Sequence, residues 1–102
     1  NVLLLCAGWK GKFNLEDSVF AGAVMERLLE SGKFGMEEDS SISAKYLYMA
    51  ARDNVMSLLR SAPRRKRLES LNLYEDVKYC LTPDQSSVIP VLQDGALVRM
   101  TA

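Results

Sequence analysis

The sequence of 102 residues contains no histidine, only two cysteines and no excess of charge of either sign. Histidine is the usual general base and transition-metal ligand of proteins. Its absence excludes a serine triad, phosphohistidine chemistry and a histidine-based zinc site within this chain. Thirteen basic and thirteen acidic residues cancel, so no overall field attracts nucleic acid or an anionic membrane.

Long apolar runs are also missing. The longest, residues 2–6, is far shorter than the roughly 20 residues of a membrane-spanning helix, and nothing resembles the regions of a signal peptide. Cys6 lies in this run and Cys80 in a Tyr-Cys-Leu context. We expect both to be reduced, buried thiols of a cytoplasmic protein, with a bridge between them as the open alternative.

The first stretch of the chain predicts a strand, a loop and a helix. Residues 2–6 show no polar alternation, which is typical of a strand covered on both faces, as in the middle of a parallel sheet. Such strands deliver their chemistry at the carboxyl end, where the loop meets the next helix. We therefore expect the site within residues 8–17.

A strand covered on both faces needs neighbouring strands to satisfy its backbone donors and acceptors. The chain offers only residues 87–92 and 96–100 as further strands, joined by an Asp94-Gly95 turn of the kind that closes hairpins. Pro90 would place the first of them at an edge or leave one rung unpaired. We therefore expect residues 1–102 to be a single partial domain, the C-terminal portion of a larger protein.

Helical periodicity is clear in two long stretches. Asn14 is a good N-cap for the first, over residues 17–31, and Gly32 a good C-terminal residue. Gly22 inside this helix suggests close packing on a neighbouring element. The second helix is expected over residues 42–60, with Ser40, Ser41 or Ser43 as its cap.

Two shorter helices are expected further along the chain. Ser61 and Pro63 would start the first, and Asn72 would end it in the left-handed conformation. The second is expected over residues 73–81, with an extended segment as the alternative, before a turn at residues 82–84. A basic run at residues 64–67 is best interpreted as a solvated face, because the chain is neutral and no aromatic residues are interleaved. A nucleic-acid-binding helix over residues 60–67 is the weaker alternative.

The loop at residues 8–14 is a plausible anion cradle. It combines two flexible positions, Gly8 and Gly11, two cations, Lys10 and Lys12, and the amides of a helix N-terminus that Asn14 caps. Its spacing matches neither the Walker motif nor the dinucleotide pattern GxGxxG. By spacing alone, the signal is weak.

Two acids, Glu16 and Asp17, begin the helix after this loop. They complement the helix dipole, and Asp17, three residues after Asn14, fits the acidic partner of a capping box. Alternatively, one of them holds Mg²⁺ or orients a water molecule. Adjacent helical residues face different directions, so at most one is expected to reach the site, and both interpretations stay open.

The motif CAGxxGxFxLEDxxxAG, which runs from Cys6 to Gly22, resembles the signature of the 2-phosphosulfolactate phosphatases. The similarity continues through residues 61–80 and through Val88-Ile89-Pro90-Val91 near the end, so it covers nearly the whole chain in order. Trp9 stands where the family usually has threonine, Asn14 replaces serine, and Arg64 or Arg65 and Asn72 replace glycines.

The resemblance implies a magnesium-dependent phosphatase that converts 2-phosphosulfolactate to sulfolactate and phosphate, a step toward coenzyme M. It implies an α/β fold, a mixed β-sheet flanked by helices, whose missing N-terminal segment belongs to the same protein. The substrate would be a small phosphorylated sulfonate or hydroxy acid, with no nucleic-acid or membrane partner, and a homo-oligomer is left open. We expect substrate binding by Gly8, Lys10, Gly11, Lys12 and Asn14, and catalysis and metal binding by Glu16 and Asp17.

Two further expectations follow from the resemblance. The 102-residue chain alone should be inactive, because the remaining site residues would lie in the missing segment. The bulky Trp9 in place of threonine leaves an alternative open: a non-catalytic anion-binding or assembly module that kept the fold.

Overall fold

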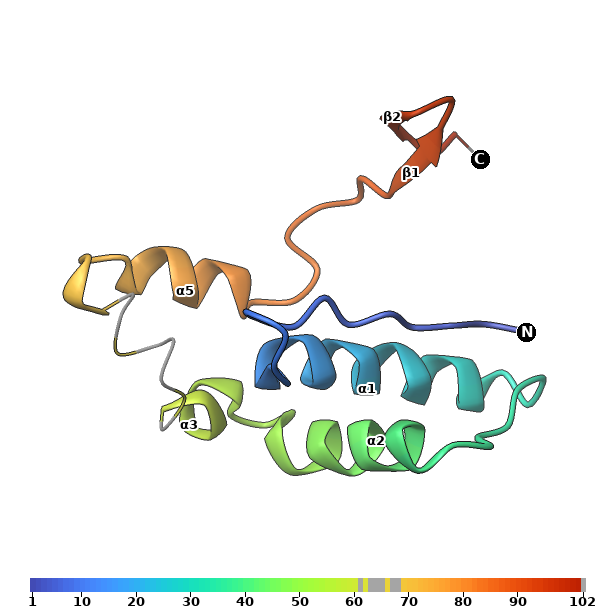
Figure 1. Cartoon of the computed structure of the whole chain (residues 1–102), viewed down its shortest axis with the longest axis horizontal. Helices are drawn as coiled ribbons and strands as arrows, with labels where there is room; N and C mark the ends of the chain where they lie inside the picture. The colour runs from blue at the N-terminus through green and yellow to red at the C-terminus, as the bar shows by residue number, and fades with distance from the viewer. Residues whose placement is uncertain (61, 63–65, 67–68, 102) are drawn as a thin grey trace.

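Two antiparallel helices, packed side by side, form the centre of the computed structural model, which describes residues 1–60, 62, 66 and 69–101 (Figure 1). Helix α1 spans Leu15–Glu30 and helix α2 spans Asp39–Ala51. The buried core is built from small and medium side chains, among them Val19, Ala21 and Ala51, and no large side chain of the described residues is fully buried. Close backbone approach therefore matters more here than large apolar side chains.

Gly22 provides that close approach. A Cβ atom at this position would overlap the carbonyl oxygen of Ala44 and lie 2.7 Å from the Cβ of Tyr48. The backbone of α1 thus touches α2 directly, and any side chain at Gly22 would force the helices apart. The close packing predicted for Gly22 is confirmed.

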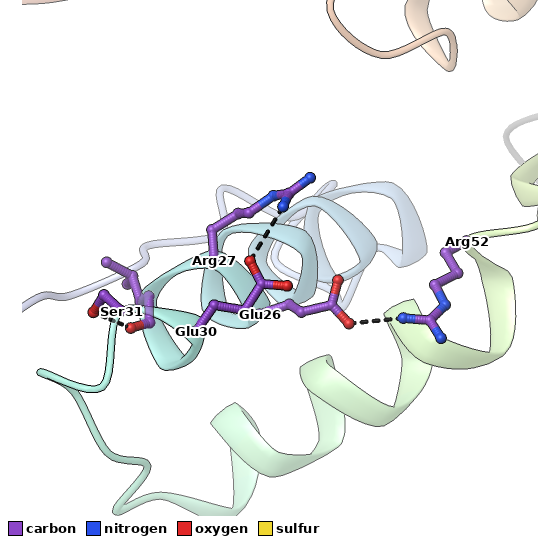
Figure 2. Close-up of polar contacts among 6 residues, drawn as sticks. Glu26, Arg27, Glu30, Ser31 and Arg52 are labelled. Carbon is purple, nitrogen blue, oxygen red and sulfur yellow. Dashed lines mark hydrogen bonds and ion pairs between the residues drawn. The ribbon is translucent and has the colours of Figure 1, made fainter.

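Polar contacts lie along the C-terminal half of α1, and one of them reaches the end of α2 (Figure 2). Arg52, just after α2, donates to Glu26 of α1 over 2.8 Å. Within α1, Arg27 donates to the exposed Glu30 over 3.1 Å, and this hydrogen bond, helped by the charge of Glu30, raises the pKa of Arg27. Of these two pairs, Glu26–Arg52 is the one that joins α1 to the residue after α2, so it bears on the relative position of the two helices.

The first helix begins and ends as predicted. The side chain of Asn14 accepts a hydrogen bond from the amide of Asp17 over 3.2 Å. At the other end Ser31 Oγ donates to the carbonyl of Leu28 (Figure 2), and Gly32 follows with φ of +69°. That left-handed backbone is the conformation for which glycine is favoured after a helix.

The second long helix differs from the prediction. Residues 42–60 form two helices, because α2 ends at Ala51 and a short α3 spans Val55–Leu59. Asn54 causes the break: its side chain accepts from the amide of Ser57 over 3.0 Å and so starts a new helix. The predicted serine cap is also wrong, since the N-cap of α2 is Glu38, with no side-chain capping bond.

Helix α5, Tyr74–Cys80, confirms the helix predicted over residues 73–81. Asn72 before it has φ of +57°, as predicted for a left-handed helix end, and residues 81–84 form the predicted turn. The short helix predicted to start at Ser61 and Pro63, and most of the basic run, lie outside the described residues.

The C-terminal hairpin is confirmed, with shorter strands than predicted. Strand β1, Pro90–Gln93, pairs antiparallel with strand β2, Ala96–Arg99, with Pro90 opposite Arg99 at the open end. Pro90 thus begins its strand, where its missing N–H removes no inner rung. The hairpin stands away from the helices (Figure 1), and Leu92 and Leu97 are each 75% exposed.

The predicted buried strand at residues 2–6 is wrong for this structure. The segment runs extended beside α1 (Figure 1) without strand pairing, and Leu3 and Leu5 are exposed. No strand of the described residues lies beside it to pair with its backbone. The same difference corrects the cysteines: Cys6 and Cys80 are free thiols, as expected, but both are exposed.

The described residues form a mixed α/β fold, with helices and one small antiparallel sheet. Its radius of gyration is 15.1 Å, against about 13 Å for a compact domain of this length. Within the described part of the chain, no helix has the length and apolarity needed to cross a membrane.

Candidate anion-binding loop

The loop before α1 is a tight turn closed by two backbone hydrogen bonds. Trp9 and Lys12 each donate their amide to the other's carbonyl oxygen, both over 3.0 Å. The two residues between them, Lys10 and Gly11, have φ of 51° and 70°. Positive φ at both central residues is the requirement of a type I′ turn, which reverses the chain within two residues.

Helix α1 holds this turn through Asp17. One carboxylate oxygen of Asp17, Oδ2, accepts from the amide of Gly8 over 2.8 Å. The amide of Asp17 in turn donates to the side chain of Asn14, and Ser18 Oγ donates to the carbonyl of Asn14 over 3.1 Å. The start of the loop, its end and the first turn of the helix are therefore tied together.

Gly8 is required by this arrangement. Its φ is +69°, and a Cβ atom there would lie 2.5 Å from the carbonyl oxygen of Lys12, which is backbone and cannot move aside cheaply. Both the backbone conformation and the available space thus select glycine. The family motif has glycine at this position, and the positive φ and the nearby Lys12 carbonyl give the structural reason.

Lys10 occupies a conformation that lysine seldom adopts. A non-glycine residue with positive φ is uncommon, and asparagine and aspartate are the usual exceptions. Lys10 is exposed, and its Nζ lies 6.0 Å from the centre of the Trp9 ring, within reach of a cation–π interaction. Strained backbone that is held by its surroundings is a reason to look for function at a residue.

The predicted substrate-binding residues therefore divide into two groups. Gly8 and Asn14 form hydrogen bonds within the protein. The Gly8 amide donates to the Asp17 carboxylate, and the side chain of Asn14, a residue that is 8% exposed, caps α1. Lys10, Gly11 and Lys12 are exposed on the turn. An incoming anion would meet the second group, while the first group fixes the shape of the loop.

The two acids proposed for magnesium, Glu16 and Asp17, are both half-buried at the start of α1. The Asp17 carboxylate reaches back to the Gly8 amide and not to the capping residue, so the predicted capping box is not formed on that side. Across the residues that the structure describes, no group of three or more acidic or cysteine side chains gathers as a metal centre would require.

The donor chemistry of these acids still suits magnesium in part. Mg²⁺ is usually bound through one or two carboxylates together with substrate phosphate oxygens and water. Glu16, or the second oxygen of Asp17, is a donor of this kind. A complete site would need further ligands from outside the described residues.

Sequence reasoning missed two contacts of this loop. The Asp17–Gly8 hydrogen bond joins residues nine apart, and no periodic pattern marks it. The contact of Lys10 with the Trp9 ring is the second, because the family motif usually has threonine in place of Trp9 and so gives no signal for it. The sequence signal for the Asp17–Gly8 contact is an acid, Asp17, in the first turn of a helix that follows a glycine-containing loop.

By its described elements the chain is of the α/β class, with a cationic turn fastened to the N-terminus of α1. Comparison with known families is more specific. The family model of 2-phosphosulpholactate phosphatase matches residues 1–95, so the chain belongs to this family.

Individual relatives agree with the family match. The chain is 41% identical to a probable 2-phosphosulfolactate phosphatase of Cyanothece sp., with 95% of this chain and 42% of that protein covered. A protein of the same name from Nostoc sp. is 35% identical, with 96% and 42% covered. In Caldanaerobacter subterraneus the identity is 34%, with 93% and 39% covered.

The chain thus spans about two fifths of the length of the curated relatives that it matches. No solved structure matches it.

Proposed function

We propose that this chain is the loop-bearing part of a phosphatase that hydrolyses the phosphomonoester of 2-phosphosulfolactate to sulfolactate and phosphate. Membership of the family supports the reaction class. The main support for a binding site in this loop is the Asp17–Gly8 hydrogen bond, which fastens a turn with two exposed lysines to the start of α1. Coenzyme M biosynthesis as the pathway, a cytoplasmic location and a homo-oligomer stay predictions.

Charge is the main obstacle in this reaction. A phosphomonoester dianion repels an attacking nucleophile, so catalysis depends on neutralising its oxygens and placing a water molecule. Lys10 and Lys12 supply two cations on the exposed turn, and the amide of Gly11 lies between them. These three residues bind the anionic end of the substrate, and Gly8, Asn14 and Asp17 hold the turn in position.

Glu16 is the acid with the greater freedom to act on the reaction, since Asp17 already binds the loop. We assign Glu16 to orienting the attacking water, and Glu16 or the second oxygen of Asp17 to contacting Mg²⁺. When bound, the metal would supply positive charge that polarises the phosphate. The remaining ligands would come from the rest of a complete family protein.

The relatives are more than twice as long as this chain. We therefore predict that the 102-residue chain alone is inactive and that an N-terminal part, as found in a complete relative, restores activity. A fusion supplies that part: the matching region of the Cyanothece protein is replaced by this 102-residue sequence.

The test is phosphate release by this fusion. It should be assayed with 2-phosphosulfolactate, with phospholactate as the analogue that lacks the sulfonate, and with unrelated phosphomonoesters, each with and without Mg²⁺. Magnesium-dependent release that favours the sulfonate substrate is expected. No release from any ester by a folded fusion would contradict the proposal.

A second function is favoured by one observation. Trp9 adds a large ring beside Lys10, where the family motif usually has a small hydroxyl residue. The chain could then belong to an anion-binding module that has lost the reaction. Phosphate or sulfolactate binding by the fusion without turnover, restored to turnover by Trp9→Thr, would support this alternative.

A further inference from the structure

Residues 1–7 are extended like a β-strand but pair with no neighbouring strand of the described residues. They run extended beside α1 (Figure 1), and no backbone hydrogen bond joins them to any residue that the structure describes. Their amide and carbonyl groups on both edges are therefore open to pairing. Unpaired strand edges of this kind readily accept another strand.

The two faces of this segment differ. Leu4 and Cys6 point to one side and line a groove of about 650 Å³ with residues of α1 and α2. Leu3 and Leu5, on the alternate positions, are 84% and 87% exposed. Successive side chains of a strand point to opposite faces, so one face of the segment borders the groove beside the helix pair and the other is an uncovered apolar surface.

The groove continues this apolar surface between the segment and the helices. Leu15 and Met25 of α1 and Leu47 of α2 line it, together with Phe13, which is 75% exposed. Contiguous exposed apolar side chains mark a surface that another element covers. The pattern is that of one layer of helices with a single strand laid on it, lacking the rest of the sheet.

The relatives indicate what covers it. They have more than twice the length of this chain, and a central strand needs a neighbour on each of its two edges. A second copy of this chain that paired through the same segment would cover one edge and leave the other open. The additional part of a family protein is long enough to supply strands to both edges.

We propose that residues 2–6 accept a β-strand on each edge, both from the part of the family protein that this chain does not span, and that this part covers Leu3 and Leu5. The segment then becomes the inner strand that its apolar sequence predicts. The groove beside it closes at the same time. This proposal rests on family membership and requires no catalysis.

Amide hydrogen exchange tests it, with the 102-residue chain and the Cyanothece fusion compared under the same conditions. In the free chain the amides of residues 3–6 should exchange freely. In the fusion they should be slowed by at least about 100-fold, as paired inner strands are. Unchanged exchange of these amides in a folded fusion would overturn the proposal, whether or not the fusion releases phosphate.

Two variants of the fusion separate strand pairing from general folding. Leu5→Pro removes one amide donor of the segment, and Leu3→Asp places a charge on its uncovered face; both should abolish the protection of residues 3–6. Leu71→Asp, at a leucine that is 57% exposed in a turn, is the matched control and should leave that protection unchanged. Equal loss in all three variants would contradict a specific docking surface.

Self-association is measured in the same way. If the free chain forms dimers at raised concentration and residues 3–6 become protected there, with no added protection in the fusion, a second copy is the occupant and the proposal is overturned.

Discussion

The protein contains two tight turns with nearly the same backbone and very different surroundings. Lys10-Gly11 and Asp94-Gly95 both have positive φ at each position, 51° and 70° in the first turn and 50° and 78° in the second. The first is bound by Asp17 to a helix that packs on a second helix. The second joins two short strands whose leucines are exposed.

The comparison separates turn geometry from site formation. Asp94 suits the left-handed conformation, since aspartate tolerates it, whereas Lys10 does not. Lysine, which fits this backbone poorly, occupies the turn that Asp17 holds, and aspartate, which fits it well, occupies the turn that stands alone. The role in anion binding proposed for Lys10 would account for this difference.

The largest effect on stability is expected at the contact between α1, which holds the first turn, and α2. Gly22→Ala places a methyl group against the backbone of Ala44, so the helices must separate. We expect a loss of about 1–3 kcal/mol in the free energy of unfolding, as for other overpacked sites, measured by urea denaturation. Gly35→Ala is the control, because a Cβ there meets nothing within 4 Å; an equal loss in both variants would contradict the packing role.

The next effect comes from the hydrogen bond that fastens the turn. Asp17→Ala leaves the Gly8 amide without its carboxylate partner and removes an acid from the first turn of α1. We expect a loss of about 1–2 kcal/mol in the free energy of unfolding and faster exchange of the Gly8 amide by NMR. Glu16→Ala should leave the Gly8 amide unchanged, and an equal response of that amide to both variants would argue against the contact.

Exchanging residue types between the two turns should give opposite results. Lys10→Asn relieves the unfavourable backbone conformation and should raise the free energy of unfolding by about 0.5–1 kcal/mol, while Asp94→Lys should lower it by a similar amount. Lys10→Asn should also weaken phosphate binding by the fusion, measured by calorimetry. Stabilisation without weaker binding would remove Lys10 from the site.

The smallest effect is expected in the exposed hairpin. Leu97→Thr, at a residue that is 75% exposed and opposite Leu92, replaces the leucine by a β-branched residue, a type that is enriched in strands. In the 102-residue chain it should change the free energy of unfolding by less than about 0.5 kcal/mol. A loss of more than about 1 kcal/mol in the free energy of unfolding would show that the hairpin packs against the rest of the chain in solution.

Local signals in the sequence predicted the local structure well. The cap at Asn14, the close approach at Gly22, the left-handed Asn72 and the Asp94-Gly95 hairpin are each determined by a few neighbouring residues. The break at Asn54 was missed because its side chain competes with a helix whose apolar periodicity continues through residue 59. In that competition, local hydrogen bonding outweighed the pattern.

Features that depend on distant parts of the chain were predicted less well. The apolar run at residues 2–6 indicated a buried strand, but burial needs neighbouring strands that the described residues do not provide. Within the loop, the roles of Gly8, Lys10 and Lys12 in substrate binding stay predictions, whereas the contact between Asp17 and Gly8 is seen only in the structure. The apolar pattern of residues 2–6 indicates a segment suited to burial, and the structure shows that the described residues do not bury it.

The most direct test of the account is the kcat/KM of the Lys10→Ala fusion for 2-phosphosulfolactate, compared with the unsubstituted fusion. Lys33→Ala, an exposed lysine in the loop after α1, is the matched control. We predict a fall of at least about 10-fold for Lys10→Ala, in line with the loss of a charged contact to the substrate, and no change for Lys33→Ala. Unaltered kinetics in the Lys10→Ala fusion would contradict the assignment of this loop to the substrate.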